Sequence, residues 1–119
     1  MKQEHSVSIG FVSPIQMRKL NRAWRGNDKV TDVLSFALDV GSFKGEILLS
    51  YEQAARQAKE MKHSVRDELC FLTVHGVLHL WGYDHEQPEG AKEMFLLQEK
   101  ILKHLKIDPR LSVETSEKV

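Results

Sequence analysis

The sequence predicts an α+β domain, in which a small β-sheet packs against helices. Residues 6–12 alternate apolar and polar side chains, which is the period-two pattern of a strand with one buried face. Residues 64–81 carry apolar side chains around most of a helical circumference, which is typical of a central, buried helix. A chain of 119 residues has room for one hydrophobic core. We therefore expect one domain over residues 1–119, with a frayed tail from about residue 107, where the periodicity ends.

After the first strand, the sequence predicts a helix and two further strands. Ser13 and Pro14, an N-cap followed by a proline at the first helical position, mark the start of the helix. Its apolar stripe is expected in the core: Met17, Leu20, Ala23 and Trp24. The apolar stretches 31–38 and 45–50 then predict two strands with a loop between them.

The second half of the chain is predicted to be helical. Ser50 and Ser64 have the side chains of N-caps and predict helices over residues 51–62 and 64–81. A last helix is expected over residues 91–105. Its apolar stripe consists of Met94, Leu97, Ile101 and Leu105. Three further histidines match no metal-binding spacing and are expected at the surface: His5, His63 and His104.

Three histidines at the end of the central helix have the spacing of a metal site. His75 and His79 are four residues apart, so both imidazoles lie on one face of a helix. Gly82 suits a left-handed helix end, after which the chain can fold back and bring His85 to the same ion. Three nitrogen ligands with an open fourth position are typical of a catalytic zinc site. The sequence thus predicts one Zn²⁺, although histidine ligands also suit nickel and copper.

The composition limits the location and the partners of the protein. The chain has one cysteine, Cys70, which excludes an intramolecular disulfide, and it has no signal peptide or long apolar run. We expect a cytoplasmic protein with Cys70 in its core and no membrane partner. The net charge is +0, yet residues 15–30 hold five bases against one acid. This patch predicts a surface that binds phosphates, although a solvated helix face has the same pattern.

Residues 75–85 match the motif H-G-x-L-H-L-x-G-Y-D-H at every defined position and resemble the YbeY-type family of bacterial endoribonucleases and ribosomal RNA maturation factors. Residues 20–36 are similar to that family's L-N-x-x-Y/W-R and T-D/N-V-L-S-F stretches, and residues 45–47 to its G-D/E-I strand. The resemblance implies an α+β fold with a mixed sheet and a zincin-like metal cleft, formed by the central helix and the loop after it. It also implies a zinc-dependent endoribonuclease, specific for single strands, that acts in ribosomal RNA processing (16S rRNA 3′ maturation) and ribosome quality control.

The resemblance suggests roles for individual residues. The family's histidines bind zinc, here His75, His79 and His85, and its functional arginine corresponds to Arg25, which would neutralise charge on the phosphate. Asp84 is expected to orient a ligand, hold water or transfer a proton; the metal's own water and solvent are the other sources of a base. Phosphates that flank the cleaved bond would be bound by Arg18, Lys19, Arg22 and Lys29. The implied partners are ribosomal RNA, ribosomal proteins and an assembly GTPase, with no DNA.

Two other functions fit parts of the pattern. Metzincin proteases share the spacing H-x-x-x-H-x-x-G-x-x-H, but Gly76 occupies the position of their catalytic glutamate. A non-catalytic factor that binds ribosomal RNA or an assembly protein, with a structural metal, is the main alternative.

The sequence departs from the family pattern in two places. Ala37 replaces a usual proline, a change expected to affect only a strand end. The strand and helix that usually precede the strand over residues 6–12 are absent, so we expect an exposed sheet edge.

Overall fold

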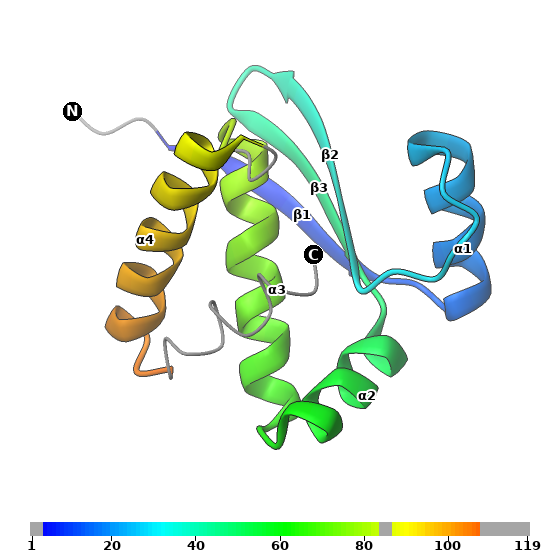
Figure 1. The fold of residues 1–119 in the computed structure, drawn as a ribbon. Coiled ribbons are helices and arrows are strands. Elements are labelled where there is room, and N and C mark those ends of the chain that lie inside the picture. The colour runs from blue at the N-terminus through cyan, green and yellow to red at the C-terminus, as the bar shows by residue number, and fades with distance from the viewer. Residues whose placement is uncertain (1–3, 84–86, 108–119) are drawn as a thin grey trace.

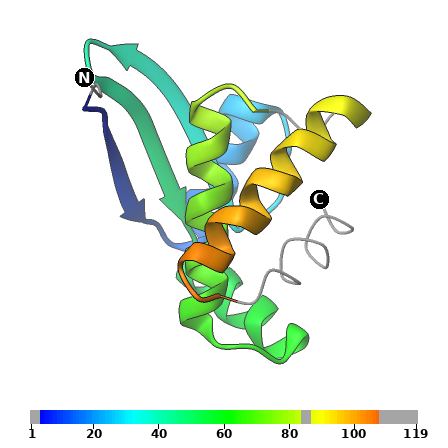
Figure 2. The same ribbon diagram turned by 90° about the vertical axis from the view of Figure 1, so that its left-hand side faces the viewer.

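A computed structural model of the chain describes residues 4–83 and 87–107. These residues form three strands and four helices, which confirm the α+β fold class. In chain order, these elements are β1 (Ser6–Phe11), α1 (Pro14–Arg25), β2 (Val33–Val40), β3 (Phe43–Leu49), α2 (Tyr51–Met61), α3 (Val65–Leu80) and α4 (Pro88–His104). In Figure 1, α4, α3, the sheet and α1 follow one another across the molecule, and Figure 2 shows the same layers from the side of α4. Helices α3 and α1 therefore lie on opposite faces of the sheet.

The sheet is mixed, with the strand order β1-β3-β2. Strand β1 runs parallel to β3, whereas β2 runs antiparallel to it. Strands β1 and β2 are thus the edge strands of the sheet that the structure describes. No helix within residues 4–83 and 87–107 is long and apolar enough to cross a lipid bilayer.

The three predicted helix starts are confirmed. Ser13, Ser50 and Ser64 each precede a helix, and each side-chain oxygen accepts a hydrogen bond from the backbone amide three residues later. The backbone amide of Ser13 in turn donates to the side-chain oxygen of Gln16, which completes a capping box. These local bonds satisfy amides that have no partner inside the helix, so they fix where each helix begins.

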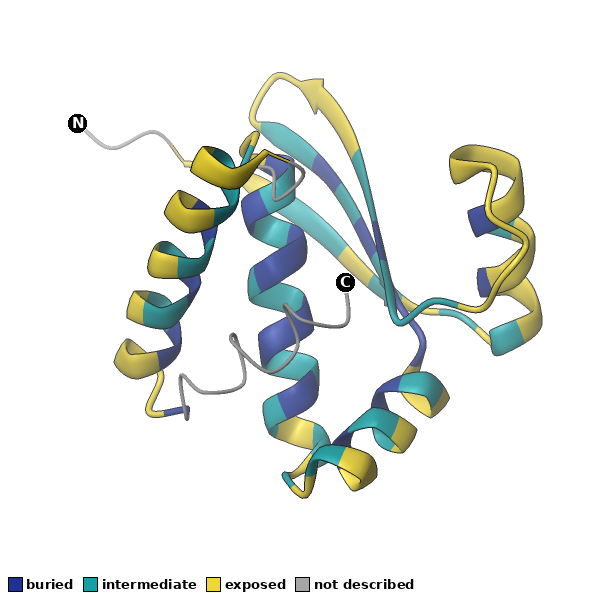
Figure 3. Cartoon of the chain, in the orientation of Figure 1, coloured by how far each residue is buried: buried dark blue, intermediate teal, exposed yellow. Residues whose placement is uncertain are grey.

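Helix α3 is the centre of the fold, and Figure 3 shows buried and partly buried residues along nearly its whole length. It packs on the face of the sheet that carries Ile47 and Leu49, both almost inaccessible to solvent. The helix lies close to the sheet at Gly76, where an added Cβ atom would lie 3.0 Å from Ile47 Cγ2 and 3.1 Å from Ser35 Oγ. The absence of a side chain at Gly76 thus sets how close α3 lies to the sheet.

Replacing Gly76 with alanine is expected to destabilise the protein by about 1–2 kcal/mol. A glycine-to-alanine change inside a helix usually stabilises by about 0.5–1 kcal/mol, but overpacking a filled core costs about 1–3 kcal/mol. Chemical denaturation of both proteins measures the difference. In an Ile47→Val background the penalty should shrink, because the Cδ1 atom 3.3 Å from the new methyl group is then absent. A Gly76→Ala protein that is more stable than the wild type would show that a methyl group fits between α3 and the sheet.

Three expectations about local structure are wrong. Residues 39–44 are not a loop, because β2 and β3 extend into a tight hairpin in which Asp39 and Gly41 take positive φ angles of 46° and 60°. Helix α4 begins at Pro88 rather than at residue 91, since proline suits the first turn of a helix. His63 is mostly buried, and its Nε2 lies 2.5 Å from the buried carboxylate of Glu68.

The expected apolar stripes of α1 and α4 also differ from the buried faces. Helix α1 buries Met17 and Asn21, and the Asn21 side chain donates to the Lys29 carbonyl at 3.0 Å. Trp24 is 68% exposed, although its ring lies edge to face against Phe36 of β2. In α4 the buried residues are Met94, Gln98 and Leu102, whereas Leu105 is 49% exposed. Both helices are therefore rotated relative to the prediction.

Candidate functional site

His75 and His79 lie next to each other on α3, as their spacing predicts. Their Nε2 atoms are 3.0 Å apart, and the ring centroids are separated by 4.5 Å. His75 is 7% exposed, whereas His79 is half-buried. Two imidazole nitrogens at this distance are stabilised by a shared proton or cation. Ligands about 2.0–2.1 Å from a tetrahedral zinc ion lie about 3.3 Å from each other, so the pair is slightly closer than two zinc ligands and needs only a small movement to bind one ion.

Gln98 of α4 holds the ring of His75. The Gln98 side-chain oxygen lies 2.6 Å from His75 Nδ1, and both residues are buried. An amide oxygen only accepts hydrogen bonds, so Nδ1 carries the proton and Nε2 keeps its lone pair. Metal-binding histidines are commonly oriented in this way by an acceptor on the other ring nitrogen. The donor set of this site therefore fits a zinc ion.

The remaining predicted site residues of this segment lie outside the described residues. They are Asp84 and His85, in residues 84–86. Gly82, just before them, has a φ angle of 94°, and its amide donates to the His79 carbonyl. The predicted left-handed end of the helix is therefore confirmed. Within residues 4–83 and 87–107, no group of three histidine, cysteine or acidic side chains is arranged to hold a metal.

An open cavity of about 400 Å³ lies where α3 ends and α4 begins. Its walls are formed by Trp81, Gly82, Tyr83, Gln87, Gly90 and Glu93. His79 precedes this wall by two residues along α3. The cavity gives solvent or a substrate room at the end of the helix that carries the histidines.

Replacing Gln98 with leucine is expected to lower zinc affinity by about 10- to 100-fold, because loss of the oriented imidazole weakens a ligand without removing it. Competition with a chromophoric chelator measures the affinity, which is independent of any catalytic assay. Met94→Leu is a matched control, since it changes a buried residue one turn earlier on the same helix. An unchanged affinity in a folded Gln98→Leu protein would remove Gln98 from the site.

Arg25 lies at the edge strand β2. Its Nη2 donates to the Ser35 backbone carbonyl at 2.5 Å, and its guanidinium lies 5.9 Å from the centre of the Phe36 ring. The hydroxyl of Ser35 in turn donates to the Gly76 carbonyl at 3.3 Å, on the residue that follows His75. Strand β2 thus connects the predicted functional arginine to the helix of the histidines.

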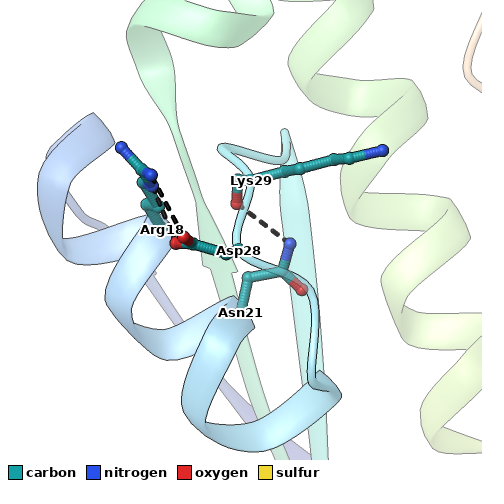
Figure 4. Close-up of polar contacts among 4 residues, drawn as sticks. All are labelled: Arg18, Asn21, Asp28 and Lys29. Atoms are coloured by element: carbon teal, nitrogen blue, oxygen red, sulfur yellow. Dashed lines mark hydrogen bonds and ion pairs between the residues drawn. The ribbon is translucent and has the colours of Figure 1, made fainter.

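The other predicted RNA-binding residues are exposed but do not form one uniform surface. Arg18 donates two hydrogen bonds to Asp28, at 2.8 and 3.1 Å (Figure 4). The hydrogen bond from Arg18 lowers the pKa of the Asp28 carboxyl, so both groups are charged at neutral pH. The Lys29 side chain extends away from Arg18 in Figure 4. The cations of this region without a described acidic partner are Lys19, Arg22, Arg25 and Lys29.

The metalloprotease alternative conflicts with the packing of α3. That mechanism needs a glutamate in place of Gly76. Gly76 faces Ile47 and Ser35, and even a methyl group there would be within 3.0 Å of the sheet. The position has no room for a catalytic carboxylate.

Two residues of the site escaped the sequence analysis. Gln98 had a recognisable signal, because it is the only polar residue in the stripe Met94, Gln98, Leu102 at successive helical turns. Ser35 is a defined position of the T-D/N-V-L-S-F stretch, but the motif gives it no role, since its contacts with Arg25 and Gly76 join segments that are far apart in the sequence.

Comparisons with known proteins show the family of the chain. Residues 1–106 match the family described as Endoribonuclease YbeY. The chain is 46% identical to Endoribonuclease YbeY of Ureaplasma urealyticum over 109 residues, which cover 88% of this chain and 70% of that protein. It is 42% identical to the Lysinibacillus sphaericus protein of the same name over 115 residues, with 86% and 73% covered.

A solved structure shows the same fold. The solution structure of TM1509 from Thermotoga maritima has a TM-score of 0.60 and 39% sequence identity. The match covers 82% of this chain and 65% of that one, so the chain spans slightly less than two thirds of that protein. On the family match and these identities, the chain belongs to the endoribonuclease YbeY family.

Proposed function

We propose that this protein is a metal-dependent endoribonuclease that cleaves single-stranded RNA, with ribosomal RNA as its substrate. The observation that carries the proposal is the pair of Nε2 atoms of His75 and His79, 3.0 Å apart, with Gln98 fixing the tautomer of His75. The names of the relatives support RNA as the substrate. The role in ribosomal RNA processing and ribosome quality control is part of this proposal and comes from the family resemblance.

Zinc is the proposed cofactor, and His75, His79 and His85 are the residues that would hold it. When bound, zinc supplies Lewis acidity, which polarises a phosphodiester oxygen and makes water a stronger acid. Gln98 would keep the Nε2 of His75 unprotonated and available as a ligand, in a buried position that limits competing water.

Arg25 is proposed to bind the phosphodiester at the cleaved bond. Its planar guanidinium matches two phosphate oxygens, and its hydrogen bond to Ser35 holds it against β2. A donor that is already in place stabilises the negative charge that develops in the transition state without reorganisation. Arg22, Lys19 and Lys29 would bind neighbouring phosphates, and Arg18 would contribute less because it is paired with Asp28.

A proton must be taken from the attacking group and given to the leaving oxygen. Gly76 has no side chain, so neither transfer uses the position that serves metalloproteases. We propose Asp84, next to the third histidine, as the residue that moves the proton, with solvent as the second route.

Metal removal tests this function. Purified protein is expected to contain about one zinc per chain, to cleave a single-stranded RNA, and to lose cleavage after chelation while its circular dichroism spectrum is unchanged. Added zinc should restore cleavage. Duplex RNA and single-stranded DNA of the same sequence should remain uncut. Loss of the fold together with the metal would instead favour the structural metal of a non-catalytic binding factor.

A further inference from the structure

Trp24 lies largely in solvent although it sits on a helix that packs against the sheet. Its side chain is 68% exposed, and its ring meets the ring of Phe36 edge to face, with centroids 6.0 Å apart. An indole is among the most costly side chains to leave in water. Phe36 holds it in place on one side, so a rigid aromatic surface faces outward from α1 and β2.

The chain segment that carries Trp24 is rich in cations. The Arg25 guanidinium lies over the Phe36 ring at 5.9 Å, and Arg22 and Lys29 are exposed in the same helix and the loop after it. The acid of this region, Asp28, is already bonded to Arg18. Exposed aromatic rings among cations are the usual footprint of a single-stranded nucleic acid, in which bases stack on the rings and phosphates pair with the cations. A purely apolar protein partner would leave these charges desolvated.

The aromatic pair is joined to the histidine site through β2. Phe36 faces α1, whereas its neighbour Ser35 contacts Gly76 of α3, because successive strand residues point to opposite faces. The Arg25 guanidinium contacts both strand residues, because it lies over the Phe36 ring and donates a hydrogen bond to the Ser35 backbone carbonyl. A strand of RNA bound along β2 would therefore contact both Arg25 and Trp24, because both side chains meet this strand.

We propose that Trp24, supported by Phe36, is a stacking platform for a base that flanks the cleaved phosphodiester of single-stranded RNA. This inference rests on the proposed function, because it assigns a binding subsite to the same substrate. Stacking on an aromatic ring is tolerant of base identity, so the platform adds affinity without adding sequence preference.

Fluorescence tests the contact directly. The chain has two tryptophans, so Trp81→Phe leaves Trp24 as the single indole reporter. Saturating amounts of a short single-stranded RNA, in protein without metal to prevent cleavage, are expected to quench this emission. An abasic oligomer with the same phosphates should not quench it. Unchanged emission at saturation, as shown by an independent label on the RNA, would overturn the proposal.

Substitutions of Trp24 distinguish stacking of a base on an aromatic ring from contact with a large apolar side chain. Trp24→Leu and Trp24→Ala are expected to weaken RNA binding by about 5- to 150-fold, the range found for loss of one stacked base. Trp24→Phe should retain most of the affinity. All three variants should bind the abasic oligomer as the wild type does. Equal RNA affinity of the leucine variant and the wild type would overturn the platform.

The failure of this inference is distinguishable from failure of the proposed function. If the wild type cleaves RNA with zinc but Trp24→Leu binds RNA normally, the function stands and the platform is wrong. If the wild type neither binds nor cleaves RNA, both are wrong. Trp24 is exposed, so its variants should retain the thermal stability of the wild type, and a melting curve of each variant checks this.

Discussion

Replacing His79 with alanine is expected to abolish zinc binding and RNA cleavage together while the fold is retained. The loss of a ligand should exceed the roughly 10- to 100-fold effect of changes around a metal site. His79 is the better choice than His75, because it is half-buried, whereas His75 is buried and bonded to Gln98. Alanine is a strong helix former, so α3 should persist. Metal analysis by plasma mass spectrometry, with a circular dichroism spectrum, measures both outcomes.

His104→Ala is the matched control for this experiment. His104 lies at the C-terminal end of α4 and is exposed, so this variant should keep its zinc and its activity. Zinc retained at about one per chain in the His79→Ala protein would contradict the proposed ligand set. Cleavage retained without zinc would contradict the metal-dependent mechanism as a whole.

Local signals in the sequence were sufficient for most of the fold. Each serine cap acts on an amide three residues away, so Ser13, Ser50 and Ser64 could be recognised without knowledge of the rest of the chain. The histidine pair is equally local, because both residues are on one helix. The apolar circumference of α3 correctly indicated the central helix, since burial on several sides needs no knowledge of which partner covers each side.

Features that depend on how elements pack could not be predicted in the same way. Trp24 is one turn from the buried Asn21, and only the angle at which α1 meets the sheet decides which of them is covered. Asn21 can be buried although it is polar, because its side-chain amide donates a hydrogen bond to the Lys29 carbonyl. The helical period identifies buried positions by their apolar side chains, so it predicted that Trp24 rather than Asn21 would lie in the core.

The same limitation applies to the site. Gln98 belongs to the buried stripe of α4, but its purpose is visible only when α4 lies against α3 and the amide reaches His75. Arg25 and His75 are linked through Ser35 of β2, and no sequence spacing encodes that link. Sequence motifs thus indicated the groups that we propose to carry the chemistry, whereas the residues that orient them required the tertiary structure.

Arg25→Ala is expected to lower kcat for RNA cleavage by about 100- to 1,000-fold, which is typical for loss of one donor to a developing anion. Zinc content should be unchanged, because Arg25 is not a ligand. Arg25→Lys should recover only part of the rate, since an ammonium keeps the charge but not the planar fork that bonds Ser35 and fits two phosphate oxygens. Single-turnover cleavage at saturating protein separates this effect from weaker binding.

Arg22→Ala distinguishes a role in the reaction from a general attraction to RNA. Arg22 is exposed on the same helix one turn before Arg25, and no hydrogen bond to its side chain is among those the structure describes for α1. Its loss should weaken RNA binding and reduce the salt dependence of that binding, with little change in the single-turnover rate. If Arg22→Ala and Arg25→Ala lowered the rate equally, Arg25 would be one of several phosphate contacts. A selective loss of rate in Arg25→Ala would instead place its guanidinium at the reacting phosphate, because general attraction depends on charge and both residues carry the same charge.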